Sequence, residues 1–179
     1  MEKKDYLFFT SLLSAYLTPK LPLPEMMSVR NTVWWRSKLK LNEVKLLAYC
    51  LMPNHFHLLL QQSSIDGITK FMRRITNAYV SYFNTRNERT GALFQGKFKA
   101  SLIEQDSYLL HLSRYIHSNP LEVRPLTRLE DYPYSSYREY LGLRHTSWIK
   151  MDDIISYFIR SFPNAKSKQS SAYLAQLEK

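Results

Sequence analysis

The stretch YCLMPNHFHLLLQQ, from Tyr49 to Gln62, decides the fold. It continues an apolar run that begins near Glu43, is interrupted by Pro53 and Asn54, and then resumes. A proline followed by an asparagine between two apolar runs is typical of a tight turn joining antiparallel strands. The pattern therefore predicts a β-hairpin whose second strand, HFHLLLQQ, begins with two histidines.

The positions of His55 and His57 suggest chemistry rather than packing alone. On a strand, side chains two positions apart point to the same face with Cα atoms about 6.6 Å apart, while Phe56 points to the other layer. Two neutral imidazoles so placed can bind one divalent cation. On spacing alone, a pair of half-buried structural histidines is the commoner explanation, and a metal site would need a third ligand.

Composition limits the classes of protein to be considered. A chain of 179 residues with 45% hydrophobic residues can bury one core, so we expect one compact domain with a helical appendage. Lysine and arginine outnumber aspartate and glutamate by 25 to 15, which favours nucleic acid over a neutral metabolite as partner. A basic protein with merely solvated charges is the alternative.

The cellular context follows from the single cysteine and from the N-terminus. Cys50 has no second cysteine with which to form an intrachain disulfide, which fits a reducing cytoplasm. The apolar residues near the N-terminus lack a signal cleavage site and the length needed to cross a bilayer. We therefore expect a cytoplasmic protein without a membrane partner.

Apolar periodicity predicts the remaining elements. Helices are expected over residues 3–17, 66–86 and 106–118, with Asn119-Pro120 ending the third, then a short helix within 131–142 and another within 147–162. Residues 92–105 are expected to end in a strand. Residues 25–42 give no clear pattern.

Tyr115 and Asn119 lie four residues apart on the third long helix and therefore share one face. Tyr115 borders an apolar stripe, so its ring can be partly buried while its hydroxyl emerges at the edge. That placement suits a nucleophile, but it equally suits a structural tyrosine, the commoner role among 13 tyrosines. Asn119 also has a plain explanation, because an asparagine before proline often simply ends a helix.

The segment between Lys70 and Lys99 is strongly basic and interleaved with aromatic residues. Such a strip can follow a phosphate backbone while rings stack on unpaired bases, although a solvated basic face is the alternative. The rings on one side of the second helix belong to the core, whereas Phe94 and Gln95 suit contact with bases. The candidate DNA-binding residues are Lys70, Arg73, Arg74, Arg86, Arg89, Phe94, Gln95, Lys97 and Lys99.

Three motifs in order carry a family resemblance. LMPNHFHLLLQ (51–61), GALFQGKFKASLIEQDSYLLHLSRYIHSNP (91–120) and YPYSSYREYLG (132–142) resemble the REP-associated tyrosine transposases. These belong to the HUH single-tyrosine superfamily, in which U is a bulky apolar residue. The resemblance covers residues 43–160 and implies an α+β fold, a ferredoxin-like or RRM-like antiparallel sheet with helices on one face. It further implies a catalytic domain over 1–125 and a C-terminal helical extension over 126–179.

The resemblance also implies roles for individual residues. His55 and His57 match catalytic metal ligands, Asn119 matches the position that completes the site, and the metal is expected to be Mg²⁺ or Mn²⁺. Tyr115 matches the nucleophile that cleaves single-stranded or hairpin DNA through a 5′-phosphotyrosine link. REP-like repeats are the expected targets, and a monomer is favoured over a dimer.

One departure from the family pattern concerns the first strand. The family's sheet begins with a strand before the first helix, next to the strand carrying the histidines, whereas this sequence begins at the helix. A misplaced start codon, a decayed gene copy or another segment filling the gap would each explain this. Residues 18–42 also resemble an insertion or a degraded region.

Two other functions therefore stay open beside strand transfer. The first is a nucleic-acid-binding protein of transposase descent that is catalytically inactive. The second is a structural zinc protein, for which one cysteine and two histidines supply too few ligands.

Overall fold

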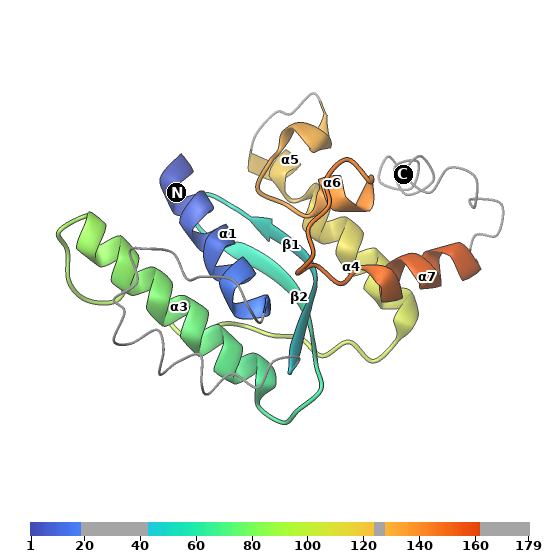
Figure 1. The fold of residues 1–179 in the computed structure, drawn as a ribbon, viewed down its shortest axis with the longest axis horizontal. Coiled ribbons are helices and arrows are strands. Elements are labelled where there is room, and N and C mark those ends of the chain that lie inside the picture. The colour runs from blue at the N-terminus through green and yellow to red at the C-terminus, as the bar shows by residue number, and fades with distance from the viewer. Residues whose placement is uncertain (19–42, 124–127, 162–179) are drawn as a thin grey trace. The chain divides into compact units, whose positions relative to one another are not determined.

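A computed structural model describes residues 1–18, 43–123 and 128–161 (Figure 1). Along these residues the elements are α1 (Lys3–Leu17), β1 (Val44–Leu51), β2 (Phe56–Gln62), α3 (Gly67–Arg86), α4 (Asp106–Ser118), α5 (Pro120–Val123), the 3-10 turn η1 (Leu129–Asp131), α6 (Tyr137–Tyr140) and α7 (Asp152–Ser161). The two strands pair with each other, which confirms the α+β class. Within the described residues the first element is α1, and residues 19–42 of the suspected insertion lie outside them.

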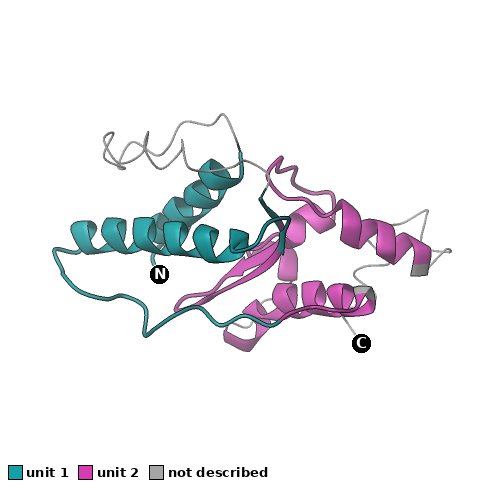
Figure 2. Ribbon diagram, turned by 90° about the horizontal axis from the view of Figure 1, so that it is seen from below, with its two compact units in different colours: residues 1–45, 61–101 teal, residues 46–60, 102–179 magenta. Residues whose placement is uncertain are grey.

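The chain forms two compact units (Figure 2). One comprises residues 1–45 and 61–101, and the other comprises residues 46–60 and 102–179. These two units are defined by spatial contacts, whereas the expected boundary between residues 125 and 126 came from the sequence. That boundary therefore stays a prediction.

In the first unit, α1 packs against α3 through aromatic rings. The predicted apolar face of α1 is buried, as are Phe71, Met72, Ile75, Tyr79 and Tyr82 on α3. Phe8 stacks on Tyr82 with ring centroids 3.7 Å apart. The buried faces repeat at the helical period, which is why periodicity located both helices well. No described helix has the length and apolarity to cross a bilayer.

The hairpin turn is the one that the sequence predicts. The Met52 amide donates to the His55 carbonyl at 2.8 Å, so Pro53 and Asn54 occupy the two central positions. β2 begins at Phe56, however, and His55 closes the turn instead of lying within the strand. This corrects the expectation that both histidines belong to the strand.

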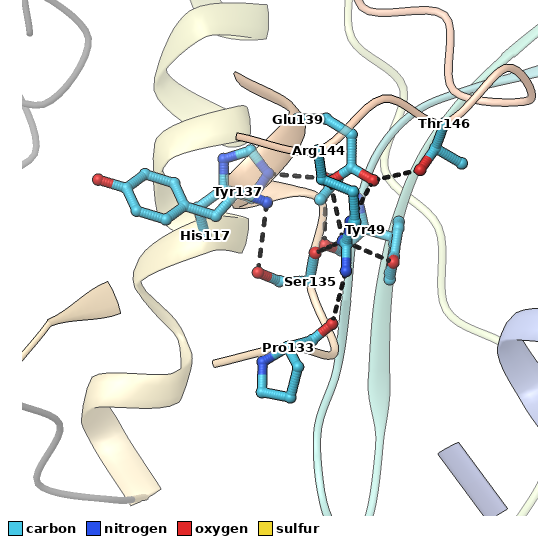
Figure 3. A network of polar contacts seen from close by, with 9 residues as sticks. Tyr49, His117, Pro133, Ser135, Tyr137, Glu139, Arg144 and Thr146 are labelled. Atoms are coloured by element: carbon cyan, nitrogen blue, oxygen red, sulfur yellow. Dashed lines mark hydrogen bonds and ion pairs between the residues drawn. The ribbon is translucent and has the colours of Figure 1, made fainter. Parts of the chain in front are cut away.

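In the second unit, segments after η1 pair with β1. The Leu51 amide donates to the Tyr134 carbonyl and the Ser136 amide donates to the Tyr49 carbonyl, both at 2.9 Å. Figure 3 shows how this segment is held, with Arg144 donating to both Glu139 carboxylate oxygens and to the Pro133 carbonyl. Both hydrogen bonds pair this segment with β1. They do not decide which explanation accounts for the first strand of the family's sheet, so all three explanations stay open.

One local expectation, the strand at the end of residues 92–105, is wrong. Residues 95–102 are all exposed, and the described residues between α3 and α4 contain no strand. A strand requires a neighbour to pair with, and propensity alone cannot supply one. The expected end of the third helix is confirmed, because α4 ends at Ser118 with Asn119 as its C-cap. A separate short helix, α5, then begins at Pro120, where a proline at the first helical position loses no hydrogen bond.

Candidate active site

His55 and His57 face each other at the start of β2. Their Nε2 atoms lie 3.1 Å apart, and the ring planes are almost perpendicular. Nδ1 of His55 lies 2.8 Å from Oδ1 of Asn54, which fixes the orientation of the His55 ring from within the turn. The hairpin thus brings the two imidazoles together as the spacing predicts.

The separation of the two nitrogens suits a metal as well as a hydrogen bond. Two neighbouring ligands at right angles, each about 2.1 Å from an ion, would be about 3.0 Å apart. No group of three or more histidine, cysteine, aspartate or glutamate side chains that could hold a metal occurs in the described part of the chain. A metal here would therefore need an uncharged ligand such as the Asn119 amide oxygen, with water completing its shell.

The ionisation of His57 favours its neutral form. Burial lowers the pKa of His57 below its usual range, and the neighbouring His55 lowers it further. A hydrogen bond with Asn119 and the negative charge of Glu122 act on this pKa in the opposite direction. The net result is a ring that stays unprotonated and able to bind a metal near neutral pH.

Tyr115 lies beside this pair. Its ring centroid is 5.8 Å from that of His57, and the side chain is 45% exposed, so the ring is accessible from solvent. Asn119 is only 2% exposed, and its Nδ2 donates to the Tyr115 carbonyl at 2.7 Å. Asn119 therefore links the end of the tyrosine helix to the imidazole of His57.

Glu122 was not among the residues expected from the sequence. It lies on α5, seven positions after Tyr115, close enough for its charge to act on His57. Because α5 follows α4 directly, two further helical turns bring Glu122 toward the face that carries Tyr115. Asn119 and Pro120 were expected to end the third helix and do so, but no sequence pattern predicted that a further short helix, α5, begins there.

The residues expected to bind DNA belong to the other unit, and their environments differ. Lys70, Arg73, Gln95, Lys97 and Lys99 are exposed, and Arg74 is partly exposed. These residues have the accessibility that binding to phosphates requires, but binding itself stays a prediction.

The other three expected DNA contacts have partners within their own unit. Arg86 forms ion pairs with Glu2 and with the buried Asp5. The guanidinium of Arg89 lies over the Phe83 ring, and Phe94 is half-buried beside Tyr79. These contacts give Arg86, Arg89 and Phe94 structural roles, whereas their contact with DNA stays a prediction.

Comparison with known proteins gives two matches. The family model described as "Transposase IS200 like" matches residues 26–119. A protein of Haemophilus influenzae, provisionally named a REP-associated tyrosine transposase, is 29% identical over 101 residues, which is 51% of this chain and 57% of that protein. The similarity thus spans little more than half the length of that relative. No solved structure matches.

Proposed function

The chain belongs to the IS200-like transposase family, and we propose that it cleaves and rejoins single-stranded or hairpin DNA through Tyr115. The observation that carries this proposal is the accessible Tyr115 ring beside His57, whose Nε2 lies 3.1 Å from that of His55. The name of the Haemophilus relative makes REP-like repeats the natural substrate to test. We place the reaction in the cytoplasm and in a monomer.

The chemistry required of Tyr115 is a nucleophilic substitution at phosphorus. The phenol oxygen attacks the phosphorus and gives up its proton to a base or to water. The bond from phosphorus to the 3′-oxygen breaks, and that oxygen takes up a proton. DNA is then joined to the protein through a 5′-phosphotyrosine, which a 3′-hydroxyl can attack to restore a phosphodiester. Bond energy is retained, so no nucleotide cofactor is needed.

The remaining residues prepare the phosphate for this attack. His55, His57 and Asn119 would hold Mg²⁺ or Mn²⁺, whose charge polarises a non-bridging phosphate oxygen. The lowered pKa of His57 keeps its nitrogen available as a ligand. The bond from Asn119 to the Tyr115 carbonyl holds the helix end in a fixed position relative to the imidazole.

Binding without catalysis is the second candidate function. The exposed basic residues of 61–101 would still attract nucleic acid in such a protein. The two candidates differ in one product, the covalent link between protein and DNA.

The test is to incubate the protein with end-labelled hairpin DNA and Mn²⁺ and to look for a covalent adduct on a denaturing gel. We expect an adduct with the wild type that disappears in Tyr115→Phe and in His57→Ala. His145→Ala replaces an exposed histidine after α6 and should leave the adduct unchanged. DNA binding should persist in Tyr115→Phe.

Two outcomes would contradict the proposal. An adduct formed by Tyr115→Phe would show that another nucleophile acts, and Tyr108 would be tested next. Binding of hairpin DNA by the wild type without any adduct would favour the second candidate function.

A further inference from the structure

The exposed face of α4 carries more aromatic surface than Tyr115 alone. The rings of Tyr108 and His111 are stacked, with centroids 5.6 Å apart and planes inclined by 15°. Tyr108 is 49% exposed, and His111 is exposed as well. Four residues after His111 comes Tyr115, whose ring in turn lies against His57.

These rings form a row. Steps of three and four residues place Tyr108, His111 and Tyr115 on one side of the helix. At 1.5 Å per residue, Tyr108 and Tyr115 are separated by about 10 Å along the helix axis. That length corresponds to about three nucleotides of one strand at 3.4 Å each.

Packing among the described residues of this unit does not account for this row. The opposite face of α4 packs into the core of this unit. It contributes Leu110 and Ile116 to the apolar cluster, and Ser113 and His117 are also buried. Tyr108 and His111 lie outside that cluster. Two stacked, accessible rings beside a candidate phosphate-attacking tyrosine have the form of a surface that binds unpaired bases.

We propose that Tyr108 and His111 form a stacking platform for unpaired bases next to the phosphate that Tyr115 attacks. The platform rests on the proposed function for its place in the reaction, because it would hold the nucleotides that flank the cleaved bond. Stacking uses the faces of bases and not their hydrogen-bonding edges, so the platform tolerates different sequences but requires a single strand. Arg114, three residues after His111 and partly exposed, supplies a positive charge close by for the backbone.

The test measures binding separately from cleavage. Tyr115→Phe serves as the parent protein, and its affinity for a single-stranded oligonucleotide containing 2-aminopurine is measured by fluorescence. Tyr108→Ala and His111→Ala should each weaken binding about tenfold, the loss expected for one stacked base, and should reduce the quenching of 2-aminopurine. Tyr108→Phe and His111→Phe keep a ring and should bind as the parent does.

His145→Ala is the matched control, because it removes an exposed histidine of the same unit from outside the row. It should change neither affinity nor quenching. The melting temperature of each variant, measured alongside, distinguishes loss of the platform from loss of the fold. A fully paired duplex without a single-stranded end should show no difference among the variants.

The platform and the proposed function can fail independently. Alanine variants that bind and quench as the parent does would overturn the platform, even if the protein with Tyr115 intact forms an adduct. Weakened binding by both alanine variants supports the platform, even if no adduct is ever formed. A parent protein that does not bind single-stranded DNA at all would also overturn it.

Discussion

The two faces of α4 use the same residue types in opposite ways. On the exposed face, His111 stacks on Tyr108 in contact with solvent. On the buried face, His117 is completely inaccessible, with Nε2 2.7 Å from the Ser136 hydroxyl and its ring 4.8 Å from that of Tyr140. Burial makes the one histidine part of the core, and exposure leaves the other histidine free to meet a ligand.

Residue type alone therefore does not locate the site. Histidine and tyrosine alternate along DSYLLHLSRYIHSNP, and the helical phase decides which of them reach solvent. We therefore expect substitutions on the buried face to change stability and equivalent substitutions on the exposed face to change binding or chemistry. This division between the two faces predicts effects on stability and on binding that can be measured separately.

Replacing the two histidines by alanine should separate the faces most clearly. His117→Ala removes a ring packed beside Tyr137 and Tyr140 and leaves a cavity, so the free energy of unfolding should fall by about 3 kcal/mol. His111→Ala should change it by less than about 0.5 kcal/mol, as is usual on the surface. Urea denaturation of both variants measures this, and equal losses would show that the division is wrong.

Acid should destabilise the protein through His117. Burial lowers the pKa of His117 from 6.5 to about 3, so on acidification the unfolded chain takes up this proton first. Stability due to this group is therefore fully present above pH 6.5 and falls below it, by at most about 1.4 kcal/mol per pH unit.

The contribution of His117 is obtained by difference from His117→Gln, which cannot titrate. The pKa of His57 is lowered too, and its effect is common to both proteins. Unfolding experiments between pH 7 and about pH 5 stay above the range in which most carboxylates titrate. If the free energy of unfolding changes equally with pH in the wild type and in His117→Gln, the assignment to His117 is refuted.

Removing one tyrosine hydroxyl from the core and another from the exposed face of α4 should change stability less, but should again separate a structural role from a functional one. The Tyr140 hydroxyl donates to the Leu47 carbonyl at 3.0 Å inside the core, so Tyr140→Phe should cost about 1 kcal/mol while DNA cleavage is retained. Tyr115→Phe should leave stability within about 0.5 kcal/mol and abolish cleavage. Thermal unfolding and the gel assay together measure both quantities, and loss of cleavage in Tyr140→Phe alone would reverse the proposed division.

Local signals in the sequence predicted the elements that carry the site. Pro53-Asn54 between two apolar runs located the hairpin, and periodic apolar residues located α1, α3 and α4, because their buried faces repeat at the helical period. The same period placed Tyr115 and Asn119 on one face. The proximity of His55 and His57 followed from the hairpin itself.

Features that depend on distant partners could not be predicted in the same way. The ion pairs of Arg86 join residues more than 80 positions apart, so a residue proposed to bind DNA is also a structural one. The segment 92–105 has strand-like residues, yet none of the strands in the described residues pairs with it. The pairing of residues 134–136 with β1 likewise depends on tertiary contacts that no local pattern encodes.

The most direct test is to locate the DNA-linked residue by mass spectrometry. The covalent adduct formed with hairpin DNA is digested with nuclease and trypsin, and the modified peptide is sequenced. We predict a nucleotide attached through phosphate to Tyr115, with Tyr108 unmodified although its side chain is just as accessible. Attachment at Tyr108 or at any other residue would contradict the account.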